Sequence, residues 1–180
     1  FNKNNRTPEQ LAELRQPVLD MMRLTTPLIM DALRAGRHVV IENPHRSDLW
    51  KTDEMAQILQ RAAEAGRPLR RVQHDQCRFR SNDDPANTFR KRMVFLTSIP
   101  ERHTEHIERL CNHPPGTHGQ CVGWKAPGEA NTAGTMHYTM EQCQAWVRAM
   151  ATAHDERRGT ATTTATTATA TATTTTAAAA

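Results

Sequence analysis

The sequence predicts an α/β fold, namely the second half of a doubly wound, Rossmann-like sheet that ends in an antiparallel pair of strands. Two short apolar runs, at residues 39–41 and 93–96, have the length and composition of buried strands. Segments with helical spacing precede the first run and separate it from the second, and such alternation is typical of a doubly wound sheet. Only a loop separates the second run from the extended segment before it, which favours antiparallel pairing.

The first predicted helix has a clear start and a clear end. Thr7 stands at the cap position and Pro8 at the first helical position, and a capping-box residue follows. Apolar residues then recur at helical spacing, although Pro17 and Pro27 are expected to kink or break the helix. Gly36 is expected to end it as a C-terminal cap.

The other elements are predicted from apolar spacing and from breaks rich in Gly and Pro. They are a helix at 51–65, an extended segment at 69–80, a turn-rich loop at 81–87, a short helix at 101–110, a loop at 111–135 and a last helix that starts at Thr139.

We expect the chain to consist of three regions. Residues 1–100 form a partial α/β sheet region, and residues 101–158 form a helix, a loop rich in His, Cys and Gly, and a terminal helix. In the last region, 159–180, every residue from Thr160 onward is Thr or Ala. This tail has no charge and no apolar pattern that could bury a core, so we expect it to be disordered.

Composition favours a basic protein without a membrane segment. The net charge is +4 and the pI is about 9.2, which favours a polyanionic partner such as DNA. Four cysteines do not make a dense disulfide framework. We find neither a signal peptide nor a run of about 20 apolar residues. These features predict an intracellular protein, in the cytoplasm or the nucleus, with no membrane partner.

A carboxylate and two guanidinium groups stand at the ends of predicted strands. Glu42 and Asn43 follow the first apolar run, and Pro44 forces the chain out of the sheet at a place where open α/β sheets bind ligands. Arg90 and Arg92 precede the second run and share one side of an extended segment. Their planar donor forks suit a base carbonyl or a phosphate, which suggests a nucleobase ligand. The simpler alternatives are a solvated carboxylate and a charged edge strand.

These two motifs, in this order, resemble the cytosine-5 DNA methyltransferases. That family reads Glu-Asn-Val at the end of a central strand and, after a helix and one more strand, Gln-x-Arg-x-Arg before an apolar strand. The first motif fits at Glu42 and the second at Arg90 and Arg92. Pro44 replaces the usual Val, as in phage-type members that read Glu-Asn-Pro, and Thr88 stands where the family has Gln. The resemblance covers the first of the three predicted regions.

The resemblance implies a role for each matching residue on a flipped cytosine in DNA. Glu42 would bond ring nitrogen 3 and the exocyclic amine. Arg92 would contact the base carbonyl or support the pocket, and Arg90 would help to orient cytosine and nucleophile. Asn43 and Pro44 would belong to the substrate-binding segment.

The resemblance also implies parts that these residues do not contain. In the family, a cysteine thiolate adds to carbon 6 of cytosine before the methyl group is transferred. That cysteine and the glycine-rich loop for S-adenosylmethionine are expected before Phe1. We therefore expect the chain to be an inactive fragment of a methyltransferase of phage or mobile-element type.

A second set of residues has the chemistry of a zinc site. Cys111, His113, His118 and Cys121 offer two thiolates and two imidazoles within the loop that follows the short helix. Their spacing matches no zinc-finger pattern, and a plain loop is the alternative. Cys77, by contrast, is interpreted as an ordinary cysteine between polar neighbours on a strand.

Two other functions remain open on this sequence. An amino methyltransferase would read Asn-Pro-Pro-aromatic at a strand end, and Asn43-Pro44 matches only the first half of that motif. A non-catalytic nucleic-acid-binding module would use the basic residues and a zinc loop, with the methyltransferase-like sheet as a relic.

Overall fold

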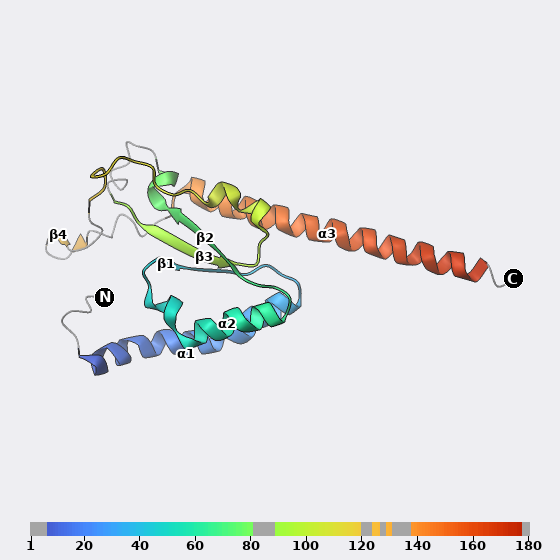
Figure 1. The fold of residues 1–180 in the computed structure, drawn as a ribbon, viewed down its shortest axis with the longest axis horizontal. Helices are drawn as coiled ribbons and strands as arrows, with labels where there is room; N and C mark the ends of the chain where they lie inside the picture. Colours follow the sequence, from blue (N-terminus) through green and yellow to red (C-terminus); the bar gives the residue numbers. More distant parts are fainter. Residues whose placement is uncertain (1–6, 81–88, 120–123, 127–128, 131–137, 178–180) are drawn as a thin grey trace.

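The computed structural model describes residues 7–80, 89–119, 124–126, 129–130 and 138–177. It is an α/β structure in which three helices cover a small antiparallel sheet (Figure 1). The helices are α1 (Pro8–Arg34), α2 (Asp53–Glu64) and α3 (Met140–Ala177). The sheet strands are β1 (Val40–Pro44), β2 (Arg70–Asp75) and β3 (Arg92–Thr97). The short elements are η2 (Asp48–Lys51), η3 (Gln76–Phe79), η5 (Glu101–His103), η6 (Glu105–Ile107), β4 (Trp124–Ala126) and β5 (Glu129–Ala130).

The sheet has the strand order β1-β3-β2, and β3 is antiparallel to both neighbours. The predicted antiparallel pair is therefore present as β2 and β3. The doubly wound, Rossmann-like sheet is not confirmed, because both pairings in this three-stranded sheet are antiparallel. Residues Met93–Leu96 of β3 form a continuous apolar run, as is typical of a strand covered on both faces. In the central position of the sheet they are at most 7% exposed.

Helices α1 and α2 cover one face of the sheet and α3 covers the other (Figure 1). On the first face, Leu96 packs with Met22 of α1 and with Ile58 of α2. On the second face, Phe95 packs with Trp146 of α3. The predicted regions 1–100 and 101–158 thus contribute to one shared hydrophobic cluster.

Local sequence explains how the helices α1 and α2 begin. The hydroxyl of Thr7 accepts a hydrogen bond from the backbone of Gln10, whose side chain accepts one from the backbone of Thr7, so the predicted capping box is present. Helix α1 continues through Pro17 and Pro27 to Arg34 as one element. Thr52 caps α2 with one hydrogen bond, which its hydroxyl accepts from the backbone N–H of Met55.

Two segments differ from what the sequence predicts. The stretch predicted as a helix at 101–110 forms the short 3₁₀ turns η5 and η6. Helix α3 continues to Ala177 through the segment predicted to be disordered. Alanine is the best helix former, and extending a helix already nucleated by packed residues is far easier than starting one.

Candidate metal centre

The candidate metal centre lies where the end of β2 meets the chain that follows η6. Strand β2 ends at the fully buried Asp75 and turns directly into η3, which holds Cys77 at 2% exposure. The backbone N–H of Asp75 donates to the carbonyl of Arg109 (3.0 Å), and the backbone N–H of Cys111 donates to Oδ2 of Asp75 (2.8 Å). These two bonds bring the distant cysteines Cys77 and Cys111 together.

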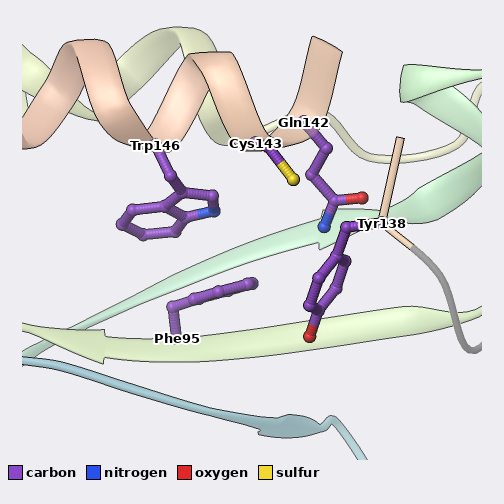
Figure 2. A pocket seen from close by; sticks show the side chains of 5 residues that line it. All are labelled: Phe95, Tyr138, Gln142, Cys143 and Trp146. Carbon is purple, nitrogen blue, oxygen red and sulfur yellow. The ribbon is translucent and has the colours of Figure 1, made fainter. Parts of the chain in front are cut away.

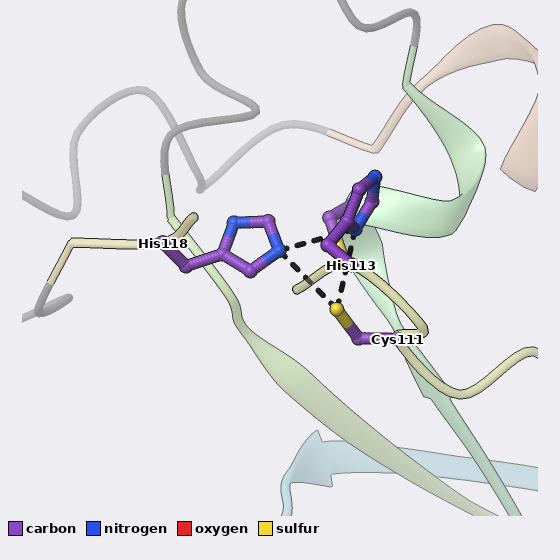
Figure 3. A group of neighbouring side chains, drawn as sticks. Cys111, His113 and His118 are labelled. Carbon is purple, nitrogen blue, oxygen red and sulfur yellow. Dashed lines mark hydrogen bonds between the residues drawn. The ribbon is translucent and has the colours of Figure 1, made fainter. Parts of the chain in front are cut away.

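A tight turn supplies the two histidines. Between His113 and His118, the backbone N–H and the hydroxyl of Thr117 both donate to the carbonyl of Pro114 (3.2 and 2.8 Å). Gly116 has a φ of +86°, a value that glycine adopts at little cost. The turn reverses the chain, so that His118 comes back to face Cys111 and His113 (Figure 3).

The ligand atoms of Cys77, Cys111, His113 and His118 all lie within 4.8 Å of one another. Sγ of Cys111 is 3.2 Å from Nδ1 of His113 and 3.2 Å from Nε2 of His118, and those two nitrogens are 3.2 Å apart. Zinc bonds of about 2.0–2.3 Å imply tetrahedral edges of about 3.3–3.8 Å. The four side chains can therefore hold a metal ion without large rearrangement.

The set of ligands differs in one member from the predicted set. Cys111, His113 and His118 come together as expected. Cys77 joins them although the sequence suggests an ordinary strand cysteine for it. Cys121, the fourth predicted ligand, lies outside the described residues.

Burial and proximity keep the Cys77 thiol protonated when no cation is present. Burial raises the pKa of Cys77 to about 12, and the neighbouring Cys111 thiol contributes to the increase. A divalent cation reverses this effect, because it binds the thiolate and so favours loss of the proton. Metal binding at this centre should therefore release protons.

The two predicted site arginines converge on Asp75. Nε and a terminal nitrogen of Arg92 lie 3.0 and 2.9 Å from the two oxygens of that carboxylate, and Nε of Arg90 lies 3.2 Å away. Burial alone would raise the pKa of Asp75, but hydrogen bonds from Arg92 and from the Cys111 backbone outweigh it and lower that pKa. Asp75 is thus an ionised carboxylate that accepts hydrogen bonds both from Arg92 and from the backbone of Cys111.

Glu42 does not share a site with Arg92. Glu42 is paired with Phe95 in the strand register, three positions after Arg92. Side chains alternate along a strand, so an odd offset places Glu42 and Arg92 on opposite faces of the sheet. Glu42 lies instead at Tyr138, whose pKa is raised by burial and then by its hydrogen bond to Glu42. Glu42 and Arg92 therefore do not face the same ligand, contrary to the roles on one cytosine that the sequence resemblance implies for them.

Asn43 and Pro44 occupy the end of β1, opposite Val94 and Met93 of the central strand. The carbonyl of Pro44 accepts hydrogen bonds from the indole nitrogen of Trp50 (2.8 Å) and from the backbone of Ser47 (3.0 Å). These bonds fix the turn into η2, so the structure gives Pro44 a clear role in folding.

A cavity of about 200 Å³ lies beneath the start of α3 (Figure 2). Its lining residues are Phe95, Tyr138, Gln142, Cys143 and Trp146. Behind it, the ring of Phe95 stacks on Trp146 (4.3 Å between centroids) and on His74 (5.0 Å). The cavity is therefore a mostly aromatic space on the face of the sheet that also carries Glu42.

Several basic side chains lie on the opposite face of the sheet, away from Glu42 and the cavity. The backbone N–H of His45 donates to the carbonyl of Arg92 (3.0 Å). The pKa of His45 is lowered first by burial and then by the charges of Arg71, Arg92 and Arg46. We call His45, Arg46, Arg71, Arg90 and Arg92 the basic patch.

Comparison of the chain with protein-family models, with curated proteins and with solved structures finds no match. Within the described residues, no helix combines the length and the apolar character that crossing a membrane requires. The site must therefore be interpreted from its own geometry.

Proposed function

We propose that this chain is a nucleic-acid-binding module in which one zinc ion holds the loop after η6 against the end of β2. The observation that carries the proposal is the cluster of Cys77, Cys111, His113 and His118. Two thiolates and two imidazoles are a preferred ligand set for zinc, and four protein ligands leave no open position for a substrate. The centre is accordingly structural and not catalytic.

The basic patch supplies the nucleic-acid partner in this proposal. Arg90 and Arg92 are 44% and 29% exposed at their side chains, and Arg46 and Arg71 are close enough to lower the pKa of His45. Guanidinium groups bind phosphate oxygens with two parallel hydrogen bonds. A net charge of +4 adds a general attraction to polyanions.

The experiment combines metal analysis with DNA binding at two salt concentrations. The purified chain is expected to contain one equivalent of zinc and to bind a short duplex DNA less tightly as salt increases. The variant R71Q should lower the slope of log affinity against log salt by about 0.9, which corresponds to one phosphate contact. Its control is R61Q, which removes the same charge from the exposed face of α2. Protein free of zinc, or equal slopes for the two variants, would contradict the proposal.

A second candidate is the carboxyl-terminal part of a cytosine-5 DNA methyltransferase. The observation that favours it is the place of Glu42 on β1, opposite Phe95 of the strand that begins at Arg92. In this candidate Glu42 recognises the base, while the arginines position the strand end from the opposite face. As the sequence resemblance implies, the nucleophile would be a cysteine thiolate and the methyl donor would be S-adenosylmethionine.

A base-recognition assay tests this second candidate on the chain itself. We expect duplexes with an unpaired cytosine to bind about 10-fold more tightly than duplexes with an unpaired thymine, because one good bidentate contact contributes about 1–3 kcal/mol of discrimination. The variant E42Q should abolish the preference. The control E13Q removes the same charge from α1 and should keep it. Equal binding of the two bases by the unmodified chain would eliminate the candidate.

A further inference from the structure

We propose that Arg90 and Arg92 form a phosphate-binding site whose geometry the metal centre sets through the carboxylate of Asp75. The inference rests on the proposed nucleic-acid binding and adds to it a link between metal occupancy and affinity for the phosphate backbone.

The carboxylate of Asp75 contacts both arginines and the backbone of the candidate metal ligand Cys111. Asp75 is 0% exposed, and its Oδ2 accepts a hydrogen bond from the backbone N–H of Cys111 (2.8 Å). The same Oδ2 lies 2.9 Å from a terminal nitrogen of Arg92 and 3.2 Å from Nε of Arg90. One carboxylate therefore holds a metal-ligand residue on one side and two guanidinium groups on the other.

Backbone connections make this arrangement depend on the metal. Cys77 follows Asp75 by two residues, within the turn that ends β2. The backbone N–H of Gln76, between them, donates to the carbonyl of Lys91, which stands between the two arginines (2.9 Å). A metal ion that binds Cys77 and Cys111 thus fixes two neighbours of Asp75: the turn that follows it in the chain, and the backbone N–H that donates to its carboxylate. Without the metal, the loop that holds the N–H of Cys111 loses its main crosslink.

Anchoring matters for the arginines because free side chains are poor binding sites. An unrestrained Arg side chain loses rotamer entropy when it binds a ligand, and this loss weakens binding. Arg92 uses Nε and one terminal nitrogen on Asp75, so its remaining donors are left for a ligand. Two guanidinium groups held in fixed orientations suit the adjacent oxygens of a phosphodiester.

The link must act in both directions. If metal binding strengthens phosphate binding by some factor, phosphate binding strengthens metal binding by the same factor. The range typical of such coupling is about 5–150-fold. We expect a value near the lower end, since the metal acts on the arginines through one intervening carboxylate.

The variant D75N tests the inference because charge and geometry predict opposite results. Removing a negative charge next to two arginines should strengthen DNA binding if only charge matters. If Asp75 positions the arginines, D75N should bind duplex DNA about 5-fold more weakly than the unmodified chain, both loaded with zinc. Removing zinc should weaken the unmodified chain by a similar factor and should leave the D75N affinity nearly unchanged. The control D53N makes the same charge change at an exposed position on α2.

The outcomes separate this inference from the proposed function. Absence of DNA binding by the zinc-loaded chain would overturn the proposed function and the inference with it. Salt-sensitive binding that D75N strengthens, as D53N does, and that zinc does not affect would overturn the inference alone. If D75N does not fold, the decision passes to R92K, which keeps the charge but loses the planar fork. R92K should bind as weakly as the zinc-free chain, whereas its control R34K should bind normally, and normal binding by R92K would overturn the inference.

Discussion

Removal of zinc is expected to lower the free energy of unfolding by several kcal/mol, the largest effect we predict for this chain. A ligand present at about 1,000 times its dissociation constant stabilises the folded state by about 4 kcal/mol. A metal ion bound by Cys77 and Cys111 would join η3 to the loop after η6, which lies about thirty-five positions further along the chain. Within that loop, the hydrogen bonds of Thr117 to Pro114 are local and cannot replace the crosslink.

Urea unfolding in the presence of zinc and of a chelator measures this effect. We expect the chelator to shift the midpoint of the unmodified chain to lower urea. The variant C77S should unfold near the chelated midpoint in either condition. C143S is the matched control, because Cys143 is an exposed cysteine outside the cluster. If zinc and the chelator give the same midpoint for the unmodified chain, the metal centre contributes nothing to stability.

The strands were predictable because their signal is local. A continuous apolar run such as 93–96 indicates a strand with cover on both faces, and β3 has this cover. The start of α1 was predictable for the same reason, since the capping box joins Thr7 to Gln10, only three positions further along the chain. The order of strands in the sheet was not predictable in this way, because it depends on contacts between distant segments.

The arginine pair shows what a sequence pattern leaves undetermined. The pattern at Arg90 and Arg92 predicts guanidinium groups opposite a carboxylate, and the structure contains such an arrangement. The carboxylate is Asp75 and not Glu42. Alternation fixes which residues of one strand share a face, but the register between strands decides which residues of its neighbours join them. Asp75 is directly opposite Arg92 in that register.

Of the candidate metal ligands, likewise, some could be predicted from the sequence and one could not. Three of them lie within a few residues of one another, so their proximity could be inferred from spacing. Cys77 could not be assigned, because it reaches the site through the pairing of Asp75 with Arg109 and Cys111. A buried polar run, His74-Asp75-Gln76, was the available signal: such groups are rarely buried unless they have partners.

Acid is expected to destabilise the fold between pH 6.5 and about 4 through His74. This side chain is 0% exposed, lies against the rings of Phe79 and Phe95, and accepts a hydrogen bond at Nε2 from the amide of Gln142 (2.7 Å). Burial lowers its pKa to about 4, with the nearby Asp75 opposing the shift. In the unfolded chain the imidazole takes up a proton near its ordinary pKa of 6.5. The unfolded state therefore binds more protons in this range, and stability falls as the pH decreases.

The contribution of His74 should be fully present above pH 6.5 and should fall by about 3 kcal/mol as the pH approaches 4. The measurement is the free energy of unfolding at several pH values in excess zinc, for the unmodified chain and for H74Q. Protonation of the metal ligands affects both proteins, so the difference between them isolates His74. The variant should lose this part of the pH dependence, whereas H154Q, at an exposed histidine, should keep it. Parallel pH profiles for the unmodified chain and H74Q would show that His74 is not the buried neutral group that the aromatic stack implies.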